Sequence, residues 1–163
     1  MKKHLLCLLT LPLIFMNTIS SQQTPKDIKV LLDKYELNLM RDDNGFDSVY
    51  LAITTQIAQQ ENNPANLAVW HSCMAQLLEN YYHSNRYRIL ERTPVEGAVP
   101  ADLNVWDIQT LVKQIVFHHQ QSLRDEDYLM RIPIRDWVPV LDSVTSEAYR
   151  PTLYDFLAFR ALD

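Results

Sequence analysis

The chain of 163 residues contains only two glycines, Gly45 and Gly97. Sheets and their hairpins usually need more, because tight turns require backbone conformations that other residues adopt poorly. The long segments between prolines and glycines instead repeat their apolar residues every three or four positions, as one face of a helix does. We therefore expect an all-α domain of antiparallel helix pairs packed into a compact body, with solenoid-like stacking as one form of that packing.

Four longer helices are predicted from apolar spacing and capping residues. The third is the clearest, because Asn63 can cap it and Pro64 suits the first helical position. Gly45 follows the first helix, where we expect it to form a left-handed helix cap. Asn104 and Asp107 resemble a capping pair before the fourth helix. The predicted ranges are 26–41, 48–60, 64–85 and 105–123, with a loop at 92–102.

Apolar stripes predict which face of each helix is buried. In the third helix the stripe consists of Leu67, Trp70, Met74, Leu77, Leu78 and Tyr81. In the fourth helix the predicted inner face consists of Val105, Ile108, Val112, Ile115, Val116 and His119. Prolines break the segment that follows, so we expect short helical turns there, with Trp137 and Leu141 packed inward.

Residues 1–20 have the three parts of a secretory signal. Lys2 and Lys3 are positive, an apolar run follows at 5–16, and small residues at Thr18 and Ser20 precede a cleavage site. The apolar run is shorter than the roughly 20 residues that span a membrane. We predict cleavage after Ser20, export through the inner membrane, and a location in the periplasm or cell envelope.

The expected mature product is a single acidic domain, residues 21–163. The net charge is −5 for the whole chain and becomes −7 when Lys2 and Lys3 are removed. Such a surface repels phosphate backbones and anionic membranes, so we expect neither nucleic acid nor a membrane as partner. One cysteine remains, Cys73, which leaves no internal disulfide. We expect Cys73 to be an inert core residue.

The sequence predicts no catalytic, cofactor-binding or metal-binding residue. Cys73 and Gln76 have the Cys-x-x-Gln spacing of an internal thioester, but a helix fixes its backbone and makes that ring hard to close. His118 and His119 are adjacent, and helix neighbours point about 100° apart. Nucleophile elbows and phosphate-binding glycine loops do not occur. A hydrolase with a dispersed site is left as a distant alternative.

Segment 81–93 mixes aromatic residues with arginines. One interpretation places the tyrosines against the core, while Arg86, Arg88 and Arg92 meet carboxylates elsewhere. The other interpretation is a protein-binding patch. The candidate interaction residues are Tyr82, Arg86, Tyr87, Arg88 and Arg92, together with Leu153, Phe156 and Leu157 of the last helix.

The chain closes on the stretch YRPTLYDFLAFRALD. Thr152 and Asp155 predict a capping box at the start of a helix over 153–162. Neither a closing glycine nor a polar tail follows this helix. We therefore expect the chain to be the N-terminal fragment of a much longer protein. Leu153, Phe156 and Leu157 would then lose packing surface and promote self-association.

Three blocks, residues 68–93, 106–123 and 149–163, resemble in order and spacing the N-terminal region of very large alpha-2-macroglobulin-like proteins of Bacteroides-type bacteria. That resemblance implies a secreted envelope protein whose helical N-terminal region precedes macroglobulin-type β-sandwich domains. As a class these proteins are thought to trap or inhibit proteases. Their bait segment and Cys-Gly-Glu-Gln thioester motif have no match here, and the segment from Cys73 to Gln76 departs from that motif.

The resemblance implies a non-enzymatic docking or scaffolding module. Its partners would be the downstream macroglobulin-type domains or another envelope protein, and no cofactor is expected. The alternative is a stand-alone secreted helical domain that binds a protein or peptide in a groove.

Overall fold

The computed structural model describes residues 23–41, 45–141 and 149–162, so the predicted signal segment lies outside the described residues. Within these ranges the regular structure is helical and contains no β-strand, which confirms the all-α class. The helices are α1 (Pro25–Arg41), α2 (Gly45–Gln59), α3 (Pro64–Leu90), α4 (Ile108–Ser122), α5 (Glu126–Leu129) and α6 (Leu153–Leu162), with 3-10 turns η1 (Leu103–Val105) and η2 (Ile134–Trp137).

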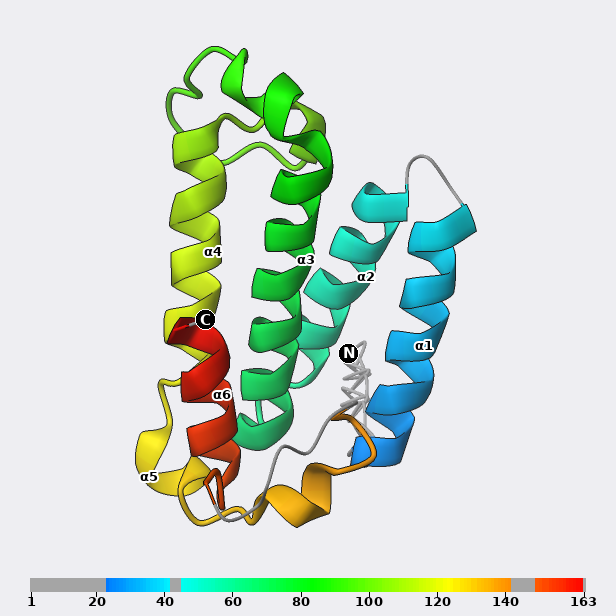
Figure 1. Ribbon diagram of the computed structural model, residues 1–163, viewed down its shortest axis with the longest axis vertical. Coiled ribbons are helices and arrows are strands. Elements are labelled where there is room, and N and C mark those ends of the chain that lie inside the picture. The colour runs from blue at the N-terminus through cyan, green and yellow to red at the C-terminus, as the bar shows by residue number, and fades with distance from the viewer. Residues whose placement is uncertain (1–22, 42–44, 142–148, 163) are drawn as a thin grey trace, which may run out of the picture.

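Helix α3 is the centre of the domain. In Figure 1 it runs between α4 on one side and α1 and α2 on the other, with α6 beside its lower half. Every residue from 65 to 72 is buried, so neighbours surround this part of α3 on all sides. The whole predicted stripe from Leu67 to Tyr81 is buried, which confirms that prediction.

The start of α3 is fixed by polar contacts as well as by packing. Asn63 caps the helix as predicted, since its side-chain oxygen accepts from the Asn66 backbone N–H at 3.2 Å. The buried Asn66 amide donates to the Gln23 carbonyl and to Gln60 Oε1, both at 2.9 Å. Trp70 Nε1 donates to Gln23 Oε1 at 3.1 Å. The chain before α1 is thereby held against α3.

The predicted beginning of α4 was one turn too early. Asp107 caps the helix, because its Oδ1 accepts from the Thr110 N–H at 2.7 Å. Asn104 instead lies in η1, which Asp102 caps through the Asn104 N–H at 2.8 Å. The hydrogen bond from Thr110 is the main reason that the pKa of Asp107 lies below its ordinary value.

The predicted inner face of α4 was also partly wrong. Leu111, His118 and Ser122 are buried, whereas the three valines of the predicted face are about half exposed. These valines are Val105 at 47 %, Val112 at 48 % and Val116 at 48 %. The helix is rotated because a polar pair, His118 with a histidine of α3, occupies the interface.

Helix α3 extends to Leu90 and not only to residue 85 as predicted, and the predicted loop at 92–102 follows it. Arg92 joins this loop to the body of the domain. Its guanidinium donates to the carbonyls of Leu103 at 3.1 Å and Trp106 at 2.8 Å. It also donates to the Tyr81 hydroxyl at 3.1 Å. Since Arg92 binds backbone carbonyls and not a carboxylate, that part of the first interpretation of segment 81–93 was wrong.

Helix α6 has the predicted capping box. The Thr152 N–H donates to Asp155 Oδ2 at 3.1 Å, and the Asp155 N–H donates to Thr152 Oγ1 at 3.2 Å. Leu153 and Leu157 are 0 % and 1 % exposed, so neither provides the apolar surface expected on this helix. They are covered because α6 packs on α3, α5 and η2.

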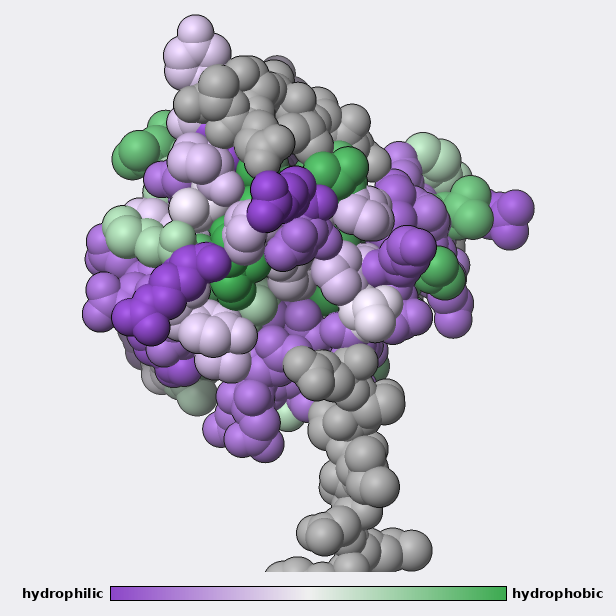
Figure 2. Space-filling model, turned by 90° about the horizontal axis from the view of Figure 1, so that it is seen from below, coloured by the Kyte–Doolittle hydropathy of each residue, from purple (hydrophilic) through white to green (hydrophobic). Residues whose placement is uncertain are grey.

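Trp137 and Leu141 are both buried, as predicted. Figure 2 views the end of the molecule where η2 lies and α6 begins. On the described part of this face, hydrophobic residues are separated by hydrophilic ones. A broad apolar surface is therefore not visible there.

Gly45 was predicted to be a left-handed cap, and this was wrong. It is the first residue of α2, and Gly97 is the glycine with a positive φ, at 87°. A Cβ atom at position 45 would lie 2.8 Å from the Asn38 carbonyl oxygen and 3.0 Å from the Leu39 Cα. Glycine is needed at this position because the backbones of α1 and α2 approach each other closely.

We predict that Gly45→Ala lowers the free energy of unfolding by about 1–3 kcal/mol, the usual effect of overpacking. Glycine to alanine in a helix ordinarily stabilises by roughly 0.5–1 kcal/mol, so the sign of the change is diagnostic. Urea denaturation measures it, with Gly97→Asn as the control, because Asn tolerates a left-handed backbone. A more stable Gly45→Ala variant would contradict the close approach.

Candidate functional site

A groove of about 540 Å³ lies between α1, α3 and α6. This volume falls in the range of roughly 300–1,000 Å³ that is typical of small-molecule sites. Much of its wall is apolar. The main apolar residues are Leu32 and Leu39 of α1, Val69 and Leu77 of α3, and Phe156 and Leu157 of α6.

One row of polar side chains follows the groove along α3. Ser72, Gln76 and Asn80 are spaced by four residues, so they lie on one helix face, and all three line the groove. Ser72 is 2 % exposed, and its hydroxyl has no hydrogen-bond partner among the described residues. Buried polar groups normally have partners. The Ser72 hydroxyl is therefore a buried polar group in the groove wall whose hydrogen-bonding capacity is unused by the described residues.

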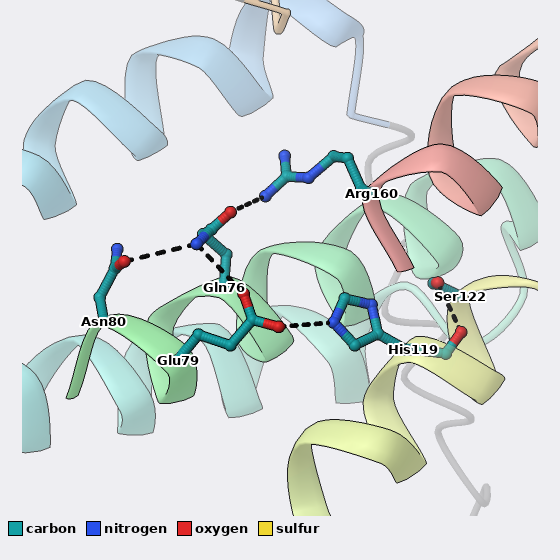
Figure 3. Close-up of polar contacts among 6 residues, drawn as sticks. All are labelled: Gln76, Glu79, Asn80, His119, Ser122 and Arg160. Carbon is teal, nitrogen blue, oxygen red and sulfur yellow. Dashed lines mark hydrogen bonds and ion pairs between the residues drawn. The ribbon is translucent and has the colours of Figure 1, made fainter. Parts of the chain in front are cut away.

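A chain of polar contacts connects α6, α3 and α4 beside the groove. Figure 3 shows Arg160 extending from α6 to Gln76, with 2.8 Å between Arg160 Nη2 and Gln76 Oε1. The Gln76 amide nitrogen donates to Glu79 Oε2 at 3.2 Å and to Asn80 Oδ1 at 3.4 Å. Glu79 Oε1 lies 2.9 Å from His119 Nε2 of α4.

The groove has an excess of positive charge. Two arginines, Arg150 and Arg160, and a single carboxylate, Glu36, are among its lining residues. The Arg160 guanidinium carbon lies 5.9 Å from the Phe156 ring centroid. Its partners among the described residues are this ring and the neutral Gln76 amide, and it forms no ion pair with any of them. The positive charge of Arg160 is thus not neutralised by a contacting carboxylate.

Cys73 was expected to be an inert core residue; it packs against the core but is partly exposed and lies in the wall of the groove. Desolvation still raises the pKa of its thiol to about 11, although the charge of Arg160 acts in the opposite direction. The thiol is therefore protonated at neutral pH and is a poor nucleophile. Gln76, the other residue of the Cys-x-x-Gln spacing, directs its side chain to Arg160 and Glu79.

A histidine pair joins α3 to α4. His71 Nδ1 and His118 Nδ1 are 2.8 Å apart, and both residues are buried. One nitrogen must donate and the other accept, so the pair fits this geometry when at least one ring is neutral. Burial lowers the pKa of both histidines to about 4. The charge of Arg124 acts in the same direction on His71. His119 points elsewhere, to Glu79, as expected for adjacent helix residues.

The last turns of α3 form a second candidate surface. In Figure 1 they rise above the ends of α1 and α2. Tyr87 is 86 % exposed and Leu90 is 54 % exposed. Arg86 and Arg88 are also exposed, and neither forms an ion pair with a described residue. The interpretation in which these two arginines meet carboxylates is therefore wrong for the described part of the chain.

The structure separates the predicted interaction residues into two groups. Tyr82, Arg86, Tyr87 and Arg88 lie on the last turns of α3, where Tyr82 is half-buried. Arg92 binds carbonyls of the loop. The α6 residues lie elsewhere: Leu153 and Leu157 are buried, and Leu157 and the half-buried Phe156 line the groove. The two groups do not form one surface.

The polar side of the groove was not predicted. The spacing of Ser72, Gln76 and Asn80 is visible in the sequence, but such a row usually marks a solvated helix face. Arg160 joins this row only because α6 packs against α3 from a distant part of the chain. That contact leaves no local signal in the sequence.

No family model matches the chain, and neither a curated protein nor a solved structure matches it. In the described parts of the chain, no three His, Cys, Asp or Glu residues are grouped so that they could hold a metal ion. None of the described helices is long and apolar enough to cross a bilayer. Inference about function therefore rests on the sequence and on the geometry above.

We predict that the free energy of unfolding falls as the pH decreases from about 6.5 to 4. Unfolded histidines bind protons near pH 6.5, whereas His71 and His118 in the folded domain resist protonation until about pH 4. The loss should be on the order of 3 kcal/mol for each histidine and complete below the folded pKa. Urea denaturation at a series of pH values measures it.

The control is the exposed His83. His83→Gln should leave the pH dependence unchanged, whereas the double variant His71→Gln and His118→Gln should flatten it. If the double variant keeps the slope of the unmodified chain between pH 4 and 6.5, the histidine pair does not cause it.

Proposed function

We propose that the chain is a non-catalytic helical docking module, which binds a protein partner through the last turns of α3. The observation that supports this most directly is the exposure of Tyr87, at 86 %, between two arginines that form no ion pair with a described residue. Tyrosine and arginine are enriched among the residues that dominate the binding energy of protein interfaces. A partner surface with carboxylates would complement Arg86 and Arg88.

The surface at the end of α3 is held rigidly by the body of the domain. Ile89, between Tyr87 and the loop, is 1 % exposed, so the last turn of the helix is anchored. Arg92 binds the carbonyls of Leu103 and Trp106 just beyond that turn. A rigid surface loses little conformational entropy on binding, which favours a specific partner.

The resemblance of three sequence blocks to alpha-2-macroglobulin-like proteins supports a narrower version of this proposal. The chain would then be the N-terminal module of a secreted envelope protein whose class is thought to trap or inhibit proteases. Its role would be to dock the following domains or an envelope partner. Cys73, with its raised pKa, is a poor candidate for covalent capture of a protease.

The alternative is a stand-alone secreted helical domain that binds a protein or peptide in a groove. The apolar wall of the groove between α1, α3 and α6 favours this alternative. The N-terminal module and the stand-alone domain predict different coding DNA beyond Asp163. An open frame that encodes macroglobulin-type β-sandwich domains supports the module, whereas an immediate stop codon without such a frame supports the stand-alone domain.

We expect a photo-crosslinkable phenylalanine analogue at position 87 to capture a partner protein in cells that produce the chain. The matched control is position 149, because Tyr149 is 85 % exposed but lies before α6, at the opposite end of the molecule. Irradiation followed by gel analysis should give a discrete adduct at position 87 only. Identical adducts at both positions, or none at 87, would contradict docking through α3.

The adduct should also depend on the arginines. Arg86→Glu with Arg88→Glu reverses the charge of the surface and should abolish the adduct at position 87, since like charges are then placed opposite each other. An adduct of unchanged intensity would mean that the two arginines do not contribute to recognition.

A further inference from the structure

We propose that the groove between α1, α3 and α6 is a binding site for an amphiphile with a carboxylate head and an apolar acyl tail, such as a medium-chain fatty acid. This inference goes beyond docking through the end of α3 and does not depend on it. Three features support it: the shape and lining of the groove, the charge of Arg160, and the unpartnered hydroxyl of Ser72.

The groove has a length and lining that suit a single acyl chain. Its α3 wall runs from Val69 to Asn80, which is roughly 16 Å at 1.5 Å per residue. A helix is about 10–12 Å wide with its side chains, whereas an extended acyl chain is much thinner. A thin, extended apolar chain uses this space better than a partner helix does.

The polarity of the groove changes along α3. Gln76 and Asn80 lie toward the C-terminal end of that wall, and Arg160 reaches Gln76 there at 2.8 Å. Val69 lies at the other end of the wall, and Val140 and Leu141 also line the groove. A ligand with one charged end and one apolar end would match this change, with its head near Arg160.

Arg160 has the properties needed to bind the head group. Its charge has no carboxylate partner among the described residues, and one of its nitrogens already donates to Gln76. Arginine offers five N–H donors in a planar fork that matches a carboxylate. The Phe156 ring 5.9 Å away and the partly buried position weaken competition from water.

Ser72 is a second polar residue in the wall of the groove. Its hydroxyl is buried without a partner, and a group left in that state destabilises the fold unless a ligand or water satisfies it. Ser72 precedes Gln76 by one helical turn, on the side away from Asn80. A polar substituent partway along the tail, such as a hydroxyl or keto oxygen, would reach it.

Isothermal titration calorimetry of the full chain with dodecanoate, below its micelle concentration, tests the proposal. We expect saturable binding of one molecule per chain. Dodecyltrimethylammonium has the same tail with a cationic head, and it should bind at least about tenfold more weakly, the factor expected for losing a charge-assisted hydrogen bond. A chain that binds neither amphiphile, or binds both equally, overturns the proposal.

Variants of Arg160 test the assignment of the head-group site. Arg160→Gln should weaken dodecanoate binding about tenfold and remove the preference for the anionic head, whereas Arg160→Lys keeps the charge and should keep that preference, with weaker binding because the planar fork is lost. Arg131→Gln is the matched control, because Arg131 is exposed and does not line the groove. If Arg131→Gln weakens binding as much as Arg160→Gln, net charge and not the groove explains the preference.

Leu77→Gln separates groove binding from adsorption at another surface. The substitution puts an amide into the apolar wall and should weaken both amphiphiles, since Leu77 lines the groove. Circular dichroism first establishes that the variant is folded; if it is not, Leu32→Gln, on the half-exposed wall of α1, replaces it. Unchanged dodecanoate affinity in a folded variant would place the binding site elsewhere.

Discussion

The fold depends on the burial of α3, in which every residue from 65 to 72 is buried. Trp70, Met74 and Leu78 are all at most 1 % exposed and lie one turn apart, so three layers of neighbours pack around one helix. Removing a buried side chain of this size ordinarily destabilises a protein by several kcal/mol. Since α2, α4, α5 and α6 all contact α3, and α1 packs on α2 with Tyr35 beside Trp70 of α3, this helix sets the position of each of the others.

Polar contacts determine how the surrounding helices are rotated against α3. The His71–His118 contact at 2.8 Å fixes the face that α4 presents, and Arg92 fixes the loop between α3 and α4. Buried polar contacts specify an arrangement because any other rotation would leave their atoms unsatisfied. The groove beside α6 depends in the same way on the contact of Arg160 with Gln76.

The sequence predicted those features that depend on local chemistry. The helical class, the cap at Asn63 and the capping box of Thr152 and Asp155 all follow from residues a few positions apart. The face of α4 was misjudged because His119 was placed inward, whereas the contact with His71 of α3 buries its neighbour His118 instead. Gly45 was misread because a close helix approach gives no signal within its own segment.

The two candidate surfaces also differ in whether they depend on contacts between distant parts of the chain. Exposed Tyr87 and its arginines were found from composition, whereas the groove required the packing of α6 on α3. Both surfaces are built on α3, so both require this helix to be rigid from end to end.

Amide hydrogen exchange by NMR tests directly whether α3 is rigid from end to end. Amides of residues 67–81 should exchange only through global unfolding, and those of residues 85–90 should remain protected. Fast exchange within either range would contradict the account.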